Sequence, residues 1–149
     1  MMVGLKRRDF STVTRQLREA QPEGAAPDTR LGSLEQQFEA IARGDLEGFF
    51  AHAHDDLTFE IFAPHEFGFI GAARGVDAVR YAIEHNFGLV EGQRPVLTSI
   101  MQQGDTIVVF GRETGIHRSG GGAYVVEFVQ KFTFREGRLA SIRSIVARA

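Results

Sequence analysis

Residues 123–134 read AYVVEFVQKFTF, a run of β-branched and aromatic side chains that is typical of a strand. Side chains along a strand alternate between two faces, so the run divides into two sets. The first set is almost wholly apolar and is expected to face a core: Tyr124, Val126, Phe128, Gln130, Phe132 and Phe134. The second set carries the charges of Glu127 and Lys131 and is expected to lie on the outer face. This strand predicts a half-buried sheet with a Phe-lined inner surface.

The sequence on both sides of this strand extends the sheet. Turns are expected at 119–122, which holds three glycines in a row, and at 135–137, which ends in Gly137. Further strands are expected at 57–63, 96–101, 106–117 and 139–147, and helices at 33–43, 46–53 and 76–87. This order predicts the α+β class: a cone-shaped roll in which three helices pack on one face of a curved, mainly antiparallel mixed sheet.

Length and composition limit the possible classes of protein. The 149 residues suit one domain, expected at 33–149, with an N-terminal extension and linker at 1–32. The absence of Cys excludes disulfides and thiolate metal sites. The net charge of −2 gives no sign of a nucleic-acid partner. No apolar run has the length of a membrane span, and the arginine pair within 6–10 is followed by polar residues, so a cytoplasmic protein is expected.

Four short motifs support a resemblance to a known superfamily. They are Ala42–Leu46, Asp55–Phe59, Ala73–Gly75 and Phe132–Leu139. In this order and spacing they resemble the nuclear-transport-factor-2-like superfamily, and within it the SnoaL-like and ketosteroid-isomerase-like branch, over about residues 33–149. The resemblance implies a small-molecule pocket in the cone, no cofactor, no metal and a homodimer. It implies no single activity, because this fold hosts isomerases, cyclases, dehydratases, epoxide hydrolases and non-catalytic binders.

Two amides are expected among the apolar inner side chains. Gln37 shares a helix face with Leu34 and Ile41, and Gln130 belongs to the inner set of its strand. They would orient a carbonyl or hydroxyl of a ligand, or bond to each other or to a water. The resemblance places Gln37 where ketosteroid isomerase has a tyrosine and Gln130 where it has a protonated aspartate, so that enzyme's mechanism is not expected.

The orientation of the strand at 106–117 is open from periodicity alone, because both of its faces begin apolar. The family pattern points Phe110 and Arg112 inward. A guanidinium facing an apolar cone needs an anion, since an isolated buried charge is costly. A bound acid or enolate would serve, or Glu60, which alternation places on the outer face unless a bulge turns it inward.

Two functions follow as hypotheses. The first is a cofactor-independent isomerase, cyclase or lyase acting on an apolar, carbonyl-bearing small molecule. In it Arg112 and Gln130 stabilise developing negative charge and His65, in the loop after the first strand, moves the proton. The second is a non-catalytic ligand-binding or dimerisation domain. The substrate-binding residues are expected to be Gln37, Phe59, Ile61, Tyr81, Phe110, Phe128, Ile142 and Ser144.

The outer face of the sheet is expected to pair with a second copy of the chain. It mixes charged side chains with apolar ones over a wide area, as isologous interfaces do. The charged members are Glu113, Glu127, Lys131 and Arg143, and the apolar members are Val109, Val125, Val129 and Ile145.

Overall fold

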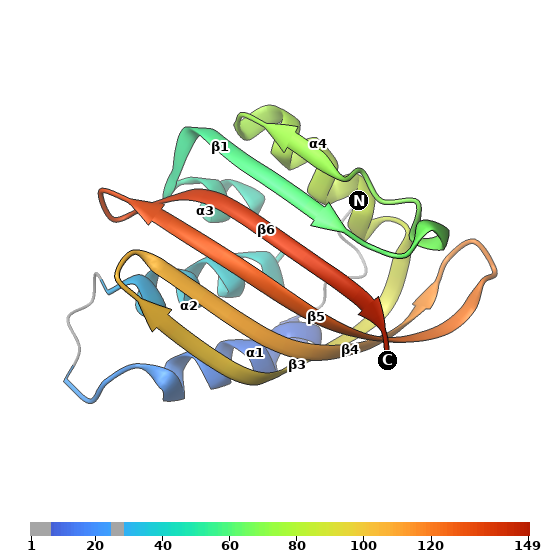
Figure 1. The fold of residues 1–149 in the computed structure, drawn as a ribbon, viewed down its shortest axis with the longest axis horizontal. Helices are drawn as coiled ribbons and strands as arrows, with labels where there is room; N and C mark the ends of the chain where they lie inside the picture. The colour runs from blue at the N-terminus through green and yellow to red at the C-terminus, as the bar shows by residue number, and fades with distance from the viewer. Residues whose placement is uncertain (1–6, 25–28) are drawn as a thin grey trace.

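The computed structural model describes residues 7–24 and 29–149, in which four α-helices lie on one side of a six-stranded sheet (Figure 1). The helices are α1 (Arg7–Ala20), α2 (Arg30–Ala42), α3 (Leu46–Phe50) and α4 (Val76–Phe87), and a short 3-10 turn, η2, spans His65–Phe67. The strands are β1 (Ala53–Phe62), β2 (Ala72–Arg74), β3 (Val90–Gln103), β4 (Thr106–His117), β5 (Gly122–Arg135) and β6 (Arg138–Arg148). The predicted α+β roll is confirmed, with one helix more than expected.

The strand order is β2-β1-β6-β5-β4-β3, so β2 and β3 are the edges of an open sheet. Strand β1 runs parallel to β6, and every other neighbouring pair is antiparallel. The pairing register shifts between Leu97 and Ser99 in β3 and between Thr133 and Phe134 in β5. Such irregularities bend strands and increase twist, which suits a sheet that curves around its own inner face.

Helix α4 begins and ends where its apolar spacing predicts, whereas α2 begins three residues earlier than expected. Its N-cap is Thr29, whose Oγ1 accepts a hydrogen bond from the backbone N–H of Gly32 at 3.2 Å. Asp45 caps α3 by accepting from the N–H of Gly48 at 2.9 Å. These caps fix where α2 and α3 begin.

Helix α1 belongs to the segment expected to be an extension. Its apolar residues Phe10, Val13 and Leu17 are buried in the same core as α2, α4 and the inner face of the sheet. Residues 1–6 and 25–28, which include part of the expected linker, lie outside the described residues. Within 7–24 and 29–149, no helix has both the length and the apolar character needed to cross a membrane.

Candidate functional site

A cavity of about 160 Å³, partly open to solvent, lies between the helices and the inner face of the sheet. A cavity of roughly 150 Å³ lined by Leu, Ile and Phe can hold one benzene molecule, so this volume suits a ligand with a single ring. Its lining is strongly aromatic: Phe10, Phe38, Phe49, Phe59, Phe67, Phe69, Phe87, Phe128 and Phe132.

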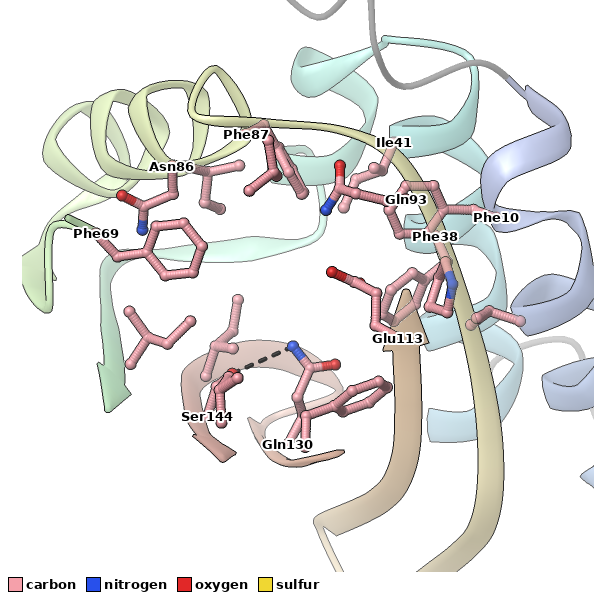
Figure 2. Close-up of a pocket in the computed structure, with 18 of the residues that line it drawn as sticks. Phe10, Phe38, Ile41, Phe69, Asn86, Phe87, Gln93, Glu113, Gln130 and Ser144 are labelled. Atoms are coloured by element: carbon pink, nitrogen blue, oxygen red, sulfur yellow. Dashed lines mark hydrogen bonds between the residues drawn. The ribbon is translucent and has the colours of Figure 1, made fainter. Parts of the chain in front are cut away.

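Six of the expected site residues line this cavity, namely Phe59, Ile61, Phe128, Gln130, Ile142 and Ser144. Register explains their convergence, because Phe59 pairs with Ile142, Ile61 with Ser144, and Gln130 with Ser144, and register partners share a face. The Gln130 amide donates to Ser144 Oγ at 3.2 Å (Figure 2). The strands β1, β5 and β6 therefore present the predicted faces to the cavity.

The prediction that Arg112 and Phe110 face inward is wrong. Arg112 is exposed and Phe110 is 36% exposed, and neither lines the cavity. Arg112 pairs in register with Glu127 of β5, which is on the outer face, so the two side chains point outward together. Glu60 is not a partner for Arg112, because strands β6 and β5 separate β1 from β4.

Three other expected residues also lie off the cavity wall. His65 is an exposed member of η2. Tyr81 is 66% exposed, because the buried face of α4 runs through Val79 and Ile83. Gln37 is fully buried beside α3, where its amide N–H is 3.5 Å from the carbonyl oxygen of Phe49. None of these three residues is among the side chains that line the cavity.

Glu113, and not Arg112, is the charged residue of β4 that faces the cavity. Because Glu113 pairs with Val126 of β5, it faces inward, and it was expected on the outer face with Val109, which is also buried. Of the described residues that line the cavity, it is the only one with an ionisable side chain. The Tyr124 hydroxyl donates to Glu113 Oε2 at 2.7 Å, and the Gln93 side chain approaches the same carboxyl group closely enough to lower its pKa.

Burial raises the pKa of the Glu113 carboxyl above its ordinary value of 4.5, and the hydrogen bond from Tyr124 and the nearby Gln93 side chain partly oppose that rise. Burial also raises the pKa of Tyr124, and the adjacent Glu113 raises it further, so the phenol stays protonated and acts as a donor. The cavity thus holds one carboxyl group whose proton is retained to a higher pH than that of an exposed glutamate.

Two glycines make room for this arrangement. Gly111 and Gly115 flank Glu113 on the inner face of β4, and their register partners are Phe128 and Tyr124. A methyl group at Gly115 would lie 2.5 Å from Cζ and from the hydroxyl oxygen of Tyr124, and one at Gly111 would collide with the Phe128 ring. Each aromatic ring therefore packs directly over a glycine of β4. The Tyr124 ring lies over Gly115, and its hydroxyl reaches the Glu113 carboxyl group.

Two further amides in the lining were not expected from the sequence. Gln93 is buried on β3, next to Gly92, whose positive φ of 62° accompanies the register shift between Glu91 and Arg94. Asn86, on α4, accepts from the backbone N–H of Ile70 at 2.8 Å and donates to its carbonyl oxygen at 3.1 Å. Figure 2 shows Gln93 and Glu113 projecting toward the cavity from one side, with Asn86 and Phe69 on the other.

Comparison with known proteins relates the chain to one family and to many solved structures. The model of a SnoaL-like domain matches residues 34–142. A comparison with curated proteins gives no match.

The similar solved structures share the fold at low sequence identity. One is an NTF2-like protein of unknown function from Burkholderia pseudomallei K96243, with 24% identity, a TM-score of 0.66, and coverage of 77% of this chain and 88% of that one. Another is an NTF2-like protein from Burkholderia xenovorans LB400, with 22% identity, a TM-score of 0.69, and coverage of 83% and 92%. A third is TerC co-crystallised with polyporic acid, with 22% identity, a TM-score of 0.65, and coverage of 82% and 92%.

Proposed function

The chain belongs to the SnoaL-like domain family, and we propose that it binds a small, neutral, largely apolar molecule in its cone and transfers a proton on that molecule through Glu113. The observation that carries the proposal is a single carboxyl group, with a raised pKa, on the wall of a Phe-lined cavity. A catalytic acid or base works best when its pKa lies near the working pH, and burial moves a glutamate in that direction.

The proposed substrate class follows from the charge and size of the lining. Of the described lining residues, none is Lys, Arg or His, so an anionic ligand would meet no positive charge there and would be repelled by ionised Glu113. Amides of Gln93 and Gln130 and the hydroxyl of Ser144 offer hydrogen bonds to a neutral oxygen. A one-ring ketone or a similarly sized carbonyl compound satisfies both conditions.

The proposed step is proton abstraction next to a carbonyl group. Ionised Glu113 takes a proton from the α-carbon, the C–H electron pair moves into the new C=C bond, and the carbonyl oxygen becomes an enolate oxygen. In this proposal the side-chain amides of Gln93 and Gln130, which line the cavity, donate hydrogen bonds to that oxygen. If the substrate is a β,γ-unsaturated ketone, the enolate extends over the second double bond, and return of the proton to the γ-carbon completes an isomerisation. If the β-carbon carries a leaving group, departure of that group with its bonding electron pair completes an elimination.

We also propose that the outer face of the sheet forms a homodimer. Phe62, Ile145, Val129 and Phe110 are successive cross-strand neighbours, so they form one apolar row over β1, β6, β5 and β4. Three of the four are between 36% and 52% exposed. Lys131 and Glu127 lie two residues to either side of Val129. A two-fold axis along the row would therefore bring Lys131 of one copy opposite Glu127 of the other.

Binding in the cone is tested by an NMR titration of the ¹⁵N-labelled protein with cyclohexanone and with cyclohexanecarboxylate. The neutral ketone is expected to shift amide signals of Phe59, Gln130 and Ser144, and the carboxylate is expected to bind more weakly. Arg112→Ala, on the outer face, is the matched control and is expected to bind the ketone as the natural chain does. Tighter binding of the carboxylate, or loss of ketone binding in Arg112→Ala, would contradict the proposed site.

A further inference from the structure

Helix α1 precedes the part of the chain that matches the family model, which begins at residue 34. Its residues Phe10, Val13 and Leu17 recur at spacings of three and four, and all three are at most 5% exposed. Phe10 and Val13 are among the side chains that line the cavity, whereas Leu17 is not. One wall of the proposed ligand site thus comes from an element outside the matched domain.

The side chain of Gln16 fixes α1 to an edge of the sheet. Its amide donates to the carbonyl oxygen of Leu97 at 2.7 Å and accepts from the backbone N–H of the same residue at 2.9 Å. Strand β3 is an edge strand, so this pair of hydrogen bonds satisfies backbone groups that lack a neighbouring strand. Leu97 itself lines the cavity, so the attachment lies at the level of the ligand site.

The other side of α1 is held on α2 by polar contacts. Arg18 contacts Glu35 through Nε at 3.0 Å and Glu39 through Nη2 at 2.8 Å, and Gln21 donates to Glu35 at 2.6 Å. Exposed ion pairs of this kind contribute little to stability, but two on one arginine restrict where the helix can lie. The helix is therefore anchored at both of its flanks.

Phe10 reaches from α1 to the two other helices at this end of the cavity. Its ring centroid lies 6.4 Å from that of Phe38 on α2 and 6.3 Å from that of Phe87 on α4, in the second case edge to face. Figure 2 shows Phe10 beside Phe38 at the side of the cavity where α1 passes. Truncation of Phe10 would enlarge the cavity without touching Glu113 or the amides.

We propose that α1 sets the size of the ligand that the cone accepts, with Phe10 as the specificity-determining residue and Val13 as a smaller contributor. This proposal rests on the ligand site proposed above, because it concerns the shape of that site. The helix closes the cone at a volume suited to one ring, and a shorter side chain at position 10 admits a second ring.

The test measures the affinity of two neutral probes, phenol and 2-naphthol, by calorimetric titration of the full chain. Phe10→Ala is expected to bind 2-naphthol roughly ten-fold or more tightly than the natural chain, because it adds space for a second ring, while its affinity for phenol changes little. Val13→Ala is expected to change in the same direction by a smaller factor. Leu17→Ala is the matched control, since Leu17 is buried on the same helix but does not line the cavity.

The outcomes separate this proposal from the proposed function. If all four proteins bind phenol and show the same preference between the probes, α1 does not set ligand size, and the ligand site stands. If Leu17→Ala gains 2-naphthol affinity as Phe10→Ala does, loosening of the helix is the cause and the role of Phe10 is overturned. If circular dichroism shows that Phe10→Ala does not fold, the probe preferences of Val13→Ala and Leu17→Ala are compared in its place, and the same outcomes decide. Absence of binding of both probes to every protein contradicts both proposals.

Discussion

The hydroxyl of Tyr124 donates a hydrogen bond to Glu113 Oε2 at 2.7 Å, across the antiparallel pair β4 and β5. A neutral donor stabilises the ionised carboxylate more than the protonated acid, so this bond opposes the rise in the Glu113 pKa that burial causes. Tyr124 thus tunes the pKa of Glu113, which is the one ionisable side chain among the described residues that line the cavity.

Removal of the Tyr124 hydroxyl is expected to raise the pKa of Glu113 further. In Tyr124→Phe the carboxyl group keeps its burial and loses its closest donor. The measurement is an NMR titration of side-chain carboxyl signals in protein labelled with ¹³C-glutamate. Tyr81→Phe is the control, because Tyr81 is the other tyrosine and is exposed on α4. A Glu113 pKa that is equal in both variants would show that the hydroxyl does not tune the carboxyl group.

Glu113→Gln is expected to make the protein more stable than the natural chain at pH 8 and nearly equal to it at pH 4. A raised pKa in the folded state means that the folded protein holds a proton that the unfolded chain has released. The free energy of unfolding therefore falls as the pH rises above the ordinary glutamate value of 4.5, and the amide removes this loss. Urea denaturation at both pH values measures the difference.

The exposed carboxylates of Asp56 and Glu66 change stability with pH in the opposite direction to Glu113. Their effect is the same in the natural chain and in Glu113→Gln, so it cancels in that comparison. Hydrogen bonds from Arg135 and Arg148 lower the pKa of Asp56 and of Glu66, so their contribution to stability is lost at low pH in both proteins. A stability difference between the two proteins that grew toward low pH would contradict the raised pKa of Glu113.

Gly115→Ala is expected to lower the free energy of unfolding by about 1–3 kcal/mol, because the new methyl group would overlap the Tyr124 ring. The double variant Gly115→Ala with Tyr124→Leu relieves the overlap, and it is expected to recover stability relative to the sum of the two single changes. Thermal denaturation of the four proteins completes the cycle. Strict additivity would show that Gly115 is not required for the position of the ring.

The two amides expected to bind substrate are predicted to behave differently. Gln37 Oε1 is buried without a hydrogen-bond partner among residues 7–24 and 29–149, so Gln37→Met is expected to leave stability unchanged or raise it by up to about 1 kcal/mol. Gln130→Met removes the contact to Ser144 and is expected to weaken cyclohexanone binding. Equal ketone affinities in the two variants would contradict the placement of Gln130 at the ligand.

A charge in the apolar row of the outer face is expected to separate the proposed dimer. Phe110→Asp or Ile145→Asp would place a carboxylate against the same row of the second copy, where it is desolvated. Light scattering coupled to size-exclusion chromatography measures the mass. Thr98→Asp, at an exposed position of the edge strand β3, is the control. A monomeric natural chain would contradict the dimer.

Much of the fold could be predicted because its signals are local. The alternation at 123–134 gave the inner face of β5 correctly, and apolar spacing gave the bounds of α4. The apolar face of α1 is as regular as that of α4, but Phe10, Val13 and Leu17 are spread among polar residues in a segment expected to be an extension. Its burial depends on contacts with α2 and β3 that are distant in sequence.

The error at β4 arose because both of its faces begin apolar, so pattern alone could not orient it. The pairing register could have oriented β4. The turn between β4 and β5 has an even number of residues, so each even-numbered residue of β5 pairs with an odd-numbered residue of β4. Tyr124 faces inward and pairs with Gly115, and two residues away Glu113 pairs with Val126. The glycines at 111 and 115, on the same face as one acid, were the overlooked signal of a site with aromatic walls.

The central claim is that Glu113 moves a proton on a neutral ketone in the cone, and deuterium incorporation into cyclohexanone in D₂O measures this most directly. The natural chain is expected to accelerate exchange of the α-protons, and Glu113→Gln is expected to lose roughly 10²-fold or more of that acceleration, since the amide cannot accept the proton. Arg112→Ala is expected to retain it. Exchange by Glu113→Gln at the natural rate, or no acceleration by a natural chain that binds the ketone, would contradict the claim; the second result would identify a non-catalytic binding domain.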